Sequence, residues 1–520
     1  MAEECALPPV GCPSDEPRFR QIQSRLPEIW RSLTEEPQRE RTVVVLPSMS
    51  LDASELARLG GSVHYEERLL FFLTLLSFPR TRLIYLSSCP IPDEVVSYYL
   101  QFLPGVPFSH ARARLRMLSV MDRSDRPLSW KILERPAFLE RLRRSVVNAP
   151  ASHMEVYRCT SLERELAVAL DLPILGADPG HLDRGTKSGS RRTFAEAGIR
   201  HADGFADLRD EQDIAQAVVH LARRNPRLRR VILKLNEGFA GAGNAVLSLG
   251  ALKLQEETSN AEAVRRVLEA LHRRLKVPGG GKPGCYLQSF CRQGGVVEAY
   301  LEGRRREAPT VQLYLTPLGE AFLDSTHDQI MGGPEQMNYL GCRFPARQEV
   351  RPELHQAGLA LGRHLAGLGV VGPLSIDFLA VPSRGGRWNL HALEINLRRG
   401  GTSHSMQALR FLTGGSYHPI EGVFYLATGE KRYYIAADSV APPSARGLAP
   451  RDLIDVSTDA GLHYKSSTHR GVVFHMMGSL SQYGRVGATC IGATPADAQA
   501  LFELTGRTLD EESRSTRWIG

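Results

Sequence analysis

The chain has 520 residues, a formal net charge of +7 and an isoelectric point near 9.0, and this length predicts two to four domains rather than one core. The positive charge favours anionic ligands, but no arginine-rich tail or basic motif with interleaved aromatic residues indicates nucleic-acid binding. The longest apolar run, Leu69 to Phe78, is too short to span a bilayer. We therefore expect neither a nucleic acid nor a membrane as a partner.

Cysteine usage and the N-terminus indicate the compartment. The eight cysteines form no CxxC pair and no zinc-type cluster, which is typical of a reducing environment. The N-terminus is acidic and contains prolines, and it lacks the basic and then apolar pattern of a secretion signal. The sequence therefore predicts a cytoplasmic enzyme.

The first 175 residues predict a lead-in segment and then a parallel sheet with crossover helices. Residues 1–40 contain one amphipathic helix, about Phe19–Leu33. Strands alternate with helices after it, as in a mononucleotide-like domain. The strands are Arg41–Pro47 and Thr81–Ser87, the helices are about Tyr65–Phe78, Asp93–Phe102 and Val156–Leu170, and Trp130 to about Leu142 continues as a helix or a connector. No GxGxxG follows the first strand, so we predict no dinucleotide site.

Two lysines and a glycine-rich loop follow. Lys187 lies in a predicted helix, Thr186–Ala197, and Lys234 lies in the apolar strand Arg230–Leu235. The loop after that strand contains Gly238, Gly241 and Gly243, whose backbone N–H groups can surround phosphates. A lysine needs a reason to sit in an apolar strand. We therefore favour a phosphate clamp over a flexible hairpin with one buried lysine stem.

The next stretch predicts antiparallel strands. A strand over Cys285–Phe290 would include Gln288 and Phe290, and a strand over Val296–Leu301 carries Glu298. Two further strands are predicted, over Ala308–Thr316 and Gly319–Asp324. His327-Asp328 comes next, and beside an active centre this pair could bind substrate, act as a base or form a structural hydrogen bond.

Residues 372–402 predict a hairpin that holds a metal ion. The strands Ser375–Val381 and Trp388–Leu397 flank the turn signal Gly385-Gly386. A turn centred there places Asp377 opposite Glu394, with Asn396 on the same face. Two carboxylates this close repel unless a cation lies between them, and carboxylate and amide oxygens suit Mg²⁺. The alternative is a solvated hairpin with scattered charge.

Arginines follow the hairpin directly. Arg398 and Arg399 precede Gly400, Gly401 and Thr402, and arginines beside a metal suit anionic groups. Further on, we predict a helix over Ser405–Thr413, several short strands and a C-terminal helix from Thr494 to about Leu504.

The ordered set of lysines, glycine loop, carboxylates and arginine resembles the ATP-grasp superfamily of carboxylate–amine ligases, and within it the peptide ligases of antibiotic biosynthesis of the pheganomycin type. The latter resemblance rests on Ser325–Gln329, Glu394–Thr402 and the additional C-terminal region. It implies an α/β chain, with α+β topology in the ATP-grasp part. The implied units are a lead-in (1–40), a mononucleotide-like pre-ATP-grasp domain (41–175), a two-subdomain ATP-grasp domain (176–415, with the nucleotide clamp at 176–284 and the hinge and metal-site subdomain at 285–415) and a small C-terminal α+β domain (416–520).

The resemblance also implies a role for each candidate residue. ATP would be bound by Lys187, Lys234, Gly238, Gly241, Gly243, Gln288, Phe290 and Glu298, of which Gln288 and Phe290 belong to the adenine hinge and Glu298 would bind the ribose. Mg²⁺ would be held by Asp377, Glu394 and Asn396. Arg398 would be catalytic, stabilising charge on the transferring phosphoryl group, and the substrate contacts would be His327, Asp328, Arg399 and Thr402.

The implied reaction is ATP-dependent amide formation. ATP would convert a small carboxylic acid, a nonproteinogenic amino acid of the guanidino type, into an acylphosphate, and the N-terminal amine of a peptide would displace phosphate. Two alternatives stay open: a kinase-like nucleotide binder with no amine acceptor, and a scaffold without chemistry. Dependence of product formation on the amine separates the first from a ligase. The oligomeric state also stays open, with a dimer as one expectation.

Overall fold

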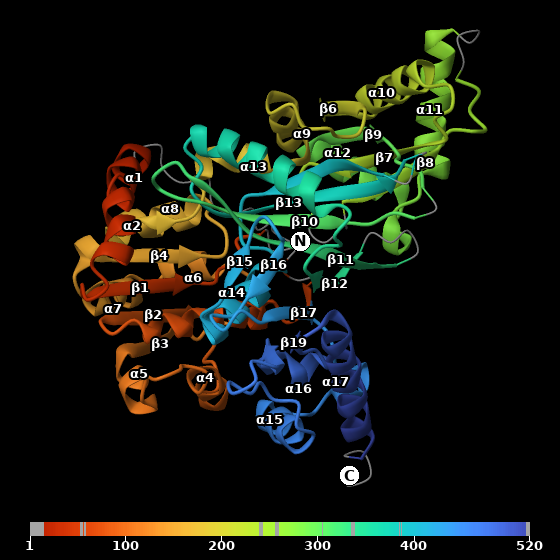
Figure 1. Ribbon diagram of the computed structural model, residues 1–520. Helices are drawn as coiled ribbons and strands as arrows, with labels where there is room; N and C mark the ends of the chain where they lie inside the picture. The colour runs from red at the N-terminus through yellow and green to blue at the C-terminus, as the bar shows by residue number, and fades with distance from the viewer. Residues whose placement is uncertain are drawn as a thin grey trace.

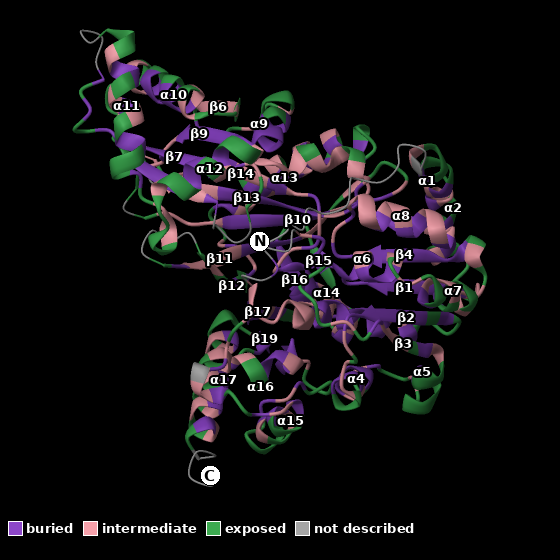
Figure 2. Cartoon of the chain, turned by 180° about the vertical axis from the view of Figure 1, so that it is seen from behind, coloured by how far each residue is buried: buried purple, intermediate pink, exposed green. Residues whose placement is uncertain are grey.

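Three β-sheets organise the molecule (Figure 1). The computed structural model describes residues 15–515 except 52–55, 57–58, 239–242, 255–258, 304, 334–337, 384 and 386. The sheets have five, four and ten strands. Most of their strand residues are buried, whereas the surrounding helices alternate buried and exposed faces (Figure 2).

The five-stranded sheet is parallel and is built from the N-terminal part of the chain. Its order is β3-β2-β1-β4-β5, with β1 (Arg41–Leu46), β2 (Thr81–Ser87), β3 (Leu115–Ser119), β4 (His153–Val156) and β5 (Ile174–Leu175). The helical segments are α1 (Asp15–Gln23), α2 (Leu26–Glu35), η1 (Ser62–Ser77), α4 (Asp93–Leu100), α5 (Phe108–Arg114), α6 (Leu128–Leu133), α7 (Pro136–Ser145) and α8 (Ser161–Leu170).

This unit confirms the predicted parallel sheet and corrects three details. The single helix predicted over Phe19–Leu33 is two helices, because the chain turns between α1 and α2, where Pro27 lies in the first turn of α2. The segment predicted as helix from Val156 begins with the last residue of β4. The predicted helix over 65–78 is the 3₁₀ segment η1.

The four-stranded antiparallel sheet has the order β6-β9-β7-β8. Its strands are β6 (Gly204–Leu208), β7 (Arg230–Leu235), β8 (Asn244–Ser248) and β9 (Gly295–Ala299). It shares an apolar core with α10 (Glu211–Arg224), α11 (Asn260–Arg274) and α12 (Pro283–Gln293). The helix α9 (Lys187–Glu196), preceded by η3 (Pro179–Gly185), leads into this unit.

The strand predicted over Cys285–Phe290 is wrong, since these residues belong to α12. Pro283 lies in the first turn of this helix, and Tyr286, Leu287 and Phe290 are its buried face, a spacing that suits a helix. The chain leaves the four-stranded sheet only after β9. The crossing to the ten-stranded sheet therefore lies between Ala299 and Pro309, and the subdomain boundary expected at 284/285 falls inside the four-stranded unit.

The ten-stranded sheet contains the predicted hairpin and extends to the C-terminal region. Its order is β14-β13-β10-β11-β12-β17-β16-β15, and β19 pairs with both β17 and β18. The strands are β10 (Pro309–Leu315), β11 (Ala321–Gly332), β12 (Asn338–Phe344), β13 (Gly372–Pro382), β14 (Trp388–Asn396), β15 (Ser416–His418), β16 (Val423–Tyr425), β17 (Lys431–Ala437), β18 (Gly471–His475) and β19 (Gly487–Gly492).

Five α-helices belong to the described residues of this part of the chain. They are α13 (Arg351–Gly367), α14 (Ser403–Thr413), α15 (Pro450–Asp459), α16 (Leu480–Tyr483) and α17 (Pro495–Ser515). Because β12 pairs with β17, residues 416–520 do not form a sheet of their own. Among the residues that the structure describes, no helix combines the length and apolarity needed to cross a membrane.

Candidate active site

The hairpin of β13 and β14 places Asp377 directly opposite Glu394, as predicted. The register explains how. Pro382 pairs with Trp388 at the turn end, whereas Asp377 pairs with Glu394 after a register shift, so Leu393 is an extra residue in β14. Such a bulge re-aims the side chains beyond it, and here it brings the two carboxylates into register.

Asn396 connects the two carboxylates. Its Nδ2 donates to Asp377 Oδ2 at 3.2 Å and to Glu394 Oε1 at 3.1 Å, so the three side chains share one face of the hairpin. Gln329 of β11 adds a hydrogen bond to Asp377 Oδ1 at 2.9 Å. Burial raises the pKa of Asp377, which indicates a site where a carboxylate needs a positive partner. Two carboxylates fit the ligand preference of Mg²⁺. In this arrangement Asn396 directs its amide nitrogen at them, and its amide oxygen would bind a cation only after the amide group rotates.

Lys187 lies against this set. Its Nζ forms an ion pair with Glu394 Oε2, and burial together with Lys234 lowers the pKa of Lys187 to about 7. The lysine is the first residue of α9, whose N-cap Thr186 accepts a hydrogen bond from Gly189 N at 3.0 Å. The cap therefore fixes where the helix starts and where the lysine stands.

Asn236 ties this helix start to the end of β7. Its backbone oxygen accepts from Lys187 N at 3.2 Å, and its Oδ1 accepts from Ser188 N at 3.0 Å. Asn236 was not among the predicted site residues, although its position directly after β7 and before the glycine loop is a usable signal.

Lys234 and Glu298 form a buried charge cluster with Arg191. Glu298 Oε2 lies 2.7 Å from Lys234 Nζ, and Glu298 Oε1 lies 2.6 Å from an Arg191 nitrogen. None of the three residues is more than 7% exposed. Burial alone would raise the pKa of Glu298, but Lys234 and Arg191 hold it below its usual value. The strand lysine thus has an anionic partner, and Arg191 is a second residue that the sequence analysis missed.

The glycine-rich loop is described only at its two ends. Gly241 lies outside the described residues, whereas Gly238 and Gly243 are described. The oxygen of Gly243 accepts from Leu235 N at 2.9 Å and from the Tyr286 hydroxyl at 3.0 Å. A Cβ on Gly243 would lie 3.2 Å from Leu235 Cβ, so a side chain here would fit only if its neighbour shifts by a few tenths of an ångström.

A pocket joins the hairpin to the clamp. Its lining includes Lys187, Gly238, Glu394, Asn396 and Arg398. Arg398 lies at the N-terminal domain, where one of its terminal nitrogens lies 3.4 Å from the Tyr157 hydroxyl and 3.1 Å from Arg399 O. These five predicted residues from separate segments therefore line one cleft, whereas Asp377, Lys234 and Glu298 do not belong to its lining. Its further polar residues are Arg158, Thr186, Asn236 and Glu237.

The four predicted substrate residues are engaged within the protein. His327 is buried, with Nε2 2.5 Å from the Tyr434 hydroxyl, and burial lowers its pKa to about 3. Asp328 accepts from Arg347 N at 3.1 Å. Arg399 pairs with Glu155 of β4 at 2.6 Å, and Thr402 is buried at the start of α14. These contacts support structural roles.

The two predicted hinge residues do not lie in the pocket lining. Gln288 is exposed on α12, and Phe290 is buried in the apolar core beneath β7. The assignment of adenine contacts to their side chains is therefore a further consequence of the wrong strand prediction.

Comparison with known proteins identifies the family. Residues 183–276 and 282–419 match the family model described as IQCH-like, ATP-grasp, and residues 452–504 match the PGM1 C-terminal domain. The chain is 30% identical to L-propargylglycine–L-glutamate ligase of Streptantibioticus cattleyicolor over 455 residues. The aligned region covers 85% of this chain and 89% of that protein. The chain belongs to the ATP-grasp family.

Other relatives agree with this fold. IQ motif-containing protein H of Danio rerio is 24% identical over 391 residues, 67% of this chain and 36% of that protein. A biotin carboxylase of Campylobacter jejuni superposes with a TM-score of 0.51 at 13% identity, covering 89% of this chain and 90% of the other. The biotin carboxylase domain of the Hydrogenobacter thermophilus 2-oxoglutarate carboxylase, solved with MgADP, gives 0.50 at 13% identity and coverages of 88% and 87%. The predicted α+β ATP-grasp architecture is confirmed.

Proposed function

We propose that this protein is an ADP-forming ligase that joins the carboxylate of a small amino acid to the amine of an amino acid or peptide. The observation that carries the proposal is the convergence of Asp377, Glu394 and Asn396 with Lys187 at the mouth of the glycine loop. This arrangement supports the proposal that hard oxygen ligands for Mg²⁺ lie beside a lysine that would bind phosphate, as transfer of a phosphoryl group requires.

The chemistry follows from the poor reactivity of a carboxylate towards an amine. A carboxylate oxygen takes the γ-phosphoryl group of ATP, and ADP leaves. The amine nitrogen then attacks the acyl carbon, the bond to the phosphate oxygen breaks, and phosphate leaves with its electron pair while the nitrogen loses a proton. The glycine loop would exclude water, which otherwise hydrolyses the acylphosphate.

The residues that line the pocket, together with Lys234 and Asp377, divide this work. Lys187 and Lys234 would hold phosphate oxygens, and Arg398 would stabilise charge on the transferring group. Asp377, Glu394 and Asn396 would hold Mg²⁺, which when bound supplies positive charge against the β- and γ-phosphates. In the structure Lys187 forms an ion pair with Glu394. When ATP binds, a phosphate oxygen would replace Glu394 as the partner of this lysine, and the Glu394 carboxylate would then be available to bind Mg²⁺.

The substrates are proposed from the relative and from the pheganomycin-type resemblance. The Streptantibioticus relative is named for two amino acids, L-propargylglycine and L-glutamate, which supports an amino-acid carboxylate as the activated group. The more specific proposal is a guanidino-type acid joined to the N-terminus of a peptide.

The test is an assay over matched acids and amines. Purified protein with ATP and Mg²⁺ is given neutral and guanidino amino acids as acids, and amino acids and short peptides as amines. We expect ADP, phosphate and amide in equal amounts, each dependent on both substrates. AMP with pyrophosphate would indicate an adenylating enzyme, and ADP formation that needs no amine would indicate the kinase-like alternative.

A further inference from the structure

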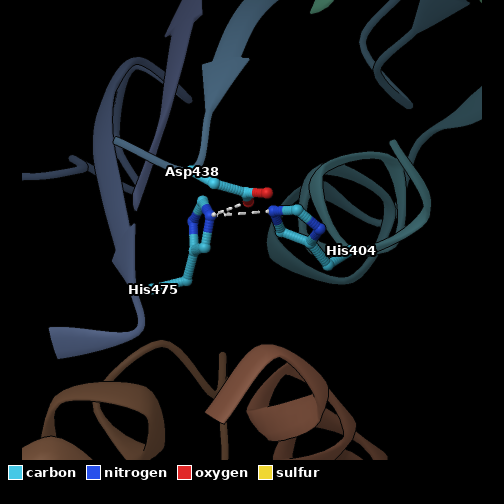
Figure 3. A group of neighbouring side chains, drawn as sticks. All are labelled: His404, Asp438 and His475. Carbon is cyan, nitrogen blue, oxygen red and sulfur yellow. Dashed lines mark hydrogen bonds and ion pairs between the residues drawn. The ribbon is translucent and has the colours of Figure 1, made fainter. Parts of the chain in front are cut away.

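A second group of metal-binding side chains lies outside the proposed ATP site. His404 is the second residue of α14, Asp438 follows β17, and His475 ends β18 (Figure 3). One nitrogen of each histidine and one carboxylate oxygen lie within 4.8 Å of one another. Both histidines are buried, at 6% and 3% exposure. Three segments far apart in sequence thus direct ligand atoms at one point.

Hydrogen bonding alone does not satisfy this group. His475 Nε2 lies 3.1 Å from His404 Nε2 and 3.1 Å from Asp438 Oδ1. If His475 Nε2 carries a proton, that single proton faces two acceptors. If it carries none, its lone pair faces a carboxylate. A cation between the three atoms would accept a lone pair from each.

The spacing suits a transition-metal ion. Zinc binds imidazole nitrogen at about 2.0–2.1 Å, and two such ligands at tetrahedral angles stand about 3.3 Å apart. The observed separation of 3.1 Å between the two Nε2 atoms is close to this value. Two imidazoles and one carboxylate form a ligand set that zinc accepts and that magnesium, which prefers oxygen, does not.

The surroundings supply what such a site needs. Arg68 forms an ion pair with Asp438 Oδ2, which leaves Oδ1 facing the histidines and orients the carboxylate. A small pocket lined by His404, His475, Arg68 and Thr489 adjoins the cluster, and it offers space for a fourth ligand.

We propose that His404, Asp438 and His475 form a binding site for one divalent transition-metal ion of the zinc class. The ion would link the strands of the C-terminal region, β17 and β18, to α14. The helix α14 begins directly after the segment 398–402, which contains Arg398 of the proposed ATP site. The ion would therefore hold the C-terminal region against the helix that follows this segment. The proposal does not depend on the proposed ligase reaction.

The test measures metal bound to the full-length protein. All proteins in this test carry Glu394→Gln, which weakens the proposed Mg²⁺ site, so that metal bound there adds little to the measured metal content. The protein is stripped with a chelator, loaded with Zn²⁺ or Co²⁺ and desalted, and metal per chain is measured by mass spectrometry. We expect one Zn²⁺ per chain, with visible Co²⁺ absorption, and loss of both in His404→Gln and His475→Gln. The matched control is His418→Gln, an exposed histidine of β15, which should retain the metal.

X-ray absorption of the zinc-loaded protein adds a readout that needs no variant at the cluster. It should show imidazole nitrogens at about 2.0–2.1 Å. The proposal is overturned if the parent protein retains no stoichiometric metal, if the histidine variants retain as much metal as His418→Gln, or if the zinc spectrum shows oxygen ligands only.

Discussion

Glu394 connects the two halves of the proposed site, because it faces Asp377 across the hairpin and pairs with Lys187 of the clamp. Changing Glu394 to Gln removes the charge and keeps the shape. We expect ADP formation to fall by at least two orders of magnitude, about 2.7 kcal/mol of transition-state stabilisation, with an unchanged circular dichroism spectrum. Near-wild-type turnover would contradict the metal assignment.

Arg399 was predicted from its position beside Arg398 to contact substrate, and its contacts support a structural role instead. It pairs with Glu155 at 2.6 Å, and its guanidinium lies 4.7 Å from the ring centre of Phe72. Breaking a buried ion pair costs about 3–5 kcal/mol because one charge stays unpaired. We expect Arg399→Met to lower the free energy of unfolding by this amount.

The double variant Glu155→Gln/Arg399→Met provides the control for this prediction, since it leaves no buried charge. Chemical denaturation should show that it recovers part of the loss. A single variant that is fully stable and fails only in substrate binding would restore the substrate role.

At the residue scale, the sequence was sufficient to predict the site residues that lie within one hairpin, β13–β14. Counting along two adjacent strands from a turn centred on Gly385-Gly386 predicts that Asp377, Glu394 and Asn396 share one face. The structure reaches the same pairing of Asp377 with Glu394 through the bulge at Leu393. Arg191 and Asn236 could not be found in this way, because their partners Glu298 and Lys187 come from segments about 50 to 110 positions away. Such contacts are set by packing, although the position of Asn236 between β7 and the glycine loop is a local signal.

At the scale of elements, the clearest error is α12. Its residues Cys285 to Phe290 include apolar and aromatic side chains that suit a short strand, and short apolar runs are ambiguous between the two structures. Two features indicate a helix: Pro283 lies in its first turn, and the buried residues after it recur at helical spacing. The strand that leads out of the clamp is β9, with Glu298.

The glycine loop gives a prediction at this scale. Valine at Gly243 would place a Cβ 3.2 Å from Leu235 Cβ, so either Leu235 or the backbone of residue 243 must shift. We expect single-turnover phosphoryl transfer to slow by roughly tenfold or more, since misplacement of about 1 Å has effects of this order. The matched control is Gly250→Val, at an exposed position with no atom within 4 Å of the added Cβ. Equal rates in the two variants would argue against a phosphate role for the loop.

For the whole molecule, the structure revises the expected division into domains. The C-terminal strands continue the sheet that contains the metal hairpin, through the pairing of β12 with β17. The sequence did not predict β12, and pairing between strands some 90 residues apart leaves no local pattern. The parallel sheet of residues 41–175 was predictable, because its alternation of strand and helix is local.

Stability should depend on pH through Glu66 of the N-terminal domain. Burial raises the pKa of Glu66 from 4.5 to about 7, even though Ser88 donates to it through N and Oγ at 2.6 Å each. The folded state therefore retains a proton that the unfolded chain releases. The retained proton therefore contributes to the free energy of unfolding in full below pH 4.5. This contribution, roughly 3 kcal/mol at most, is lost as pH rises through 7.

Denaturation midpoints at pH 5 and pH 8 check this prediction. The midpoint should fall in the wild-type protein and fall less in Glu66→Gln, which is neutral throughout. The same fall in both proteins would show that other groups cause the pH dependence.

The central claim, activation of a carboxylate by phosphoryl transfer, is tested most directly by isotope transfer. The acid substrate is labelled with ¹⁸O in its carboxylate, and the products are analysed by mass spectrometry after amide formation. Since a carboxylate oxygen takes the phosphoryl group, we predict one ¹⁸O in the inorganic phosphate for each amide formed. Amide formation with unlabelled phosphate, or with the label in AMP, would contradict the account.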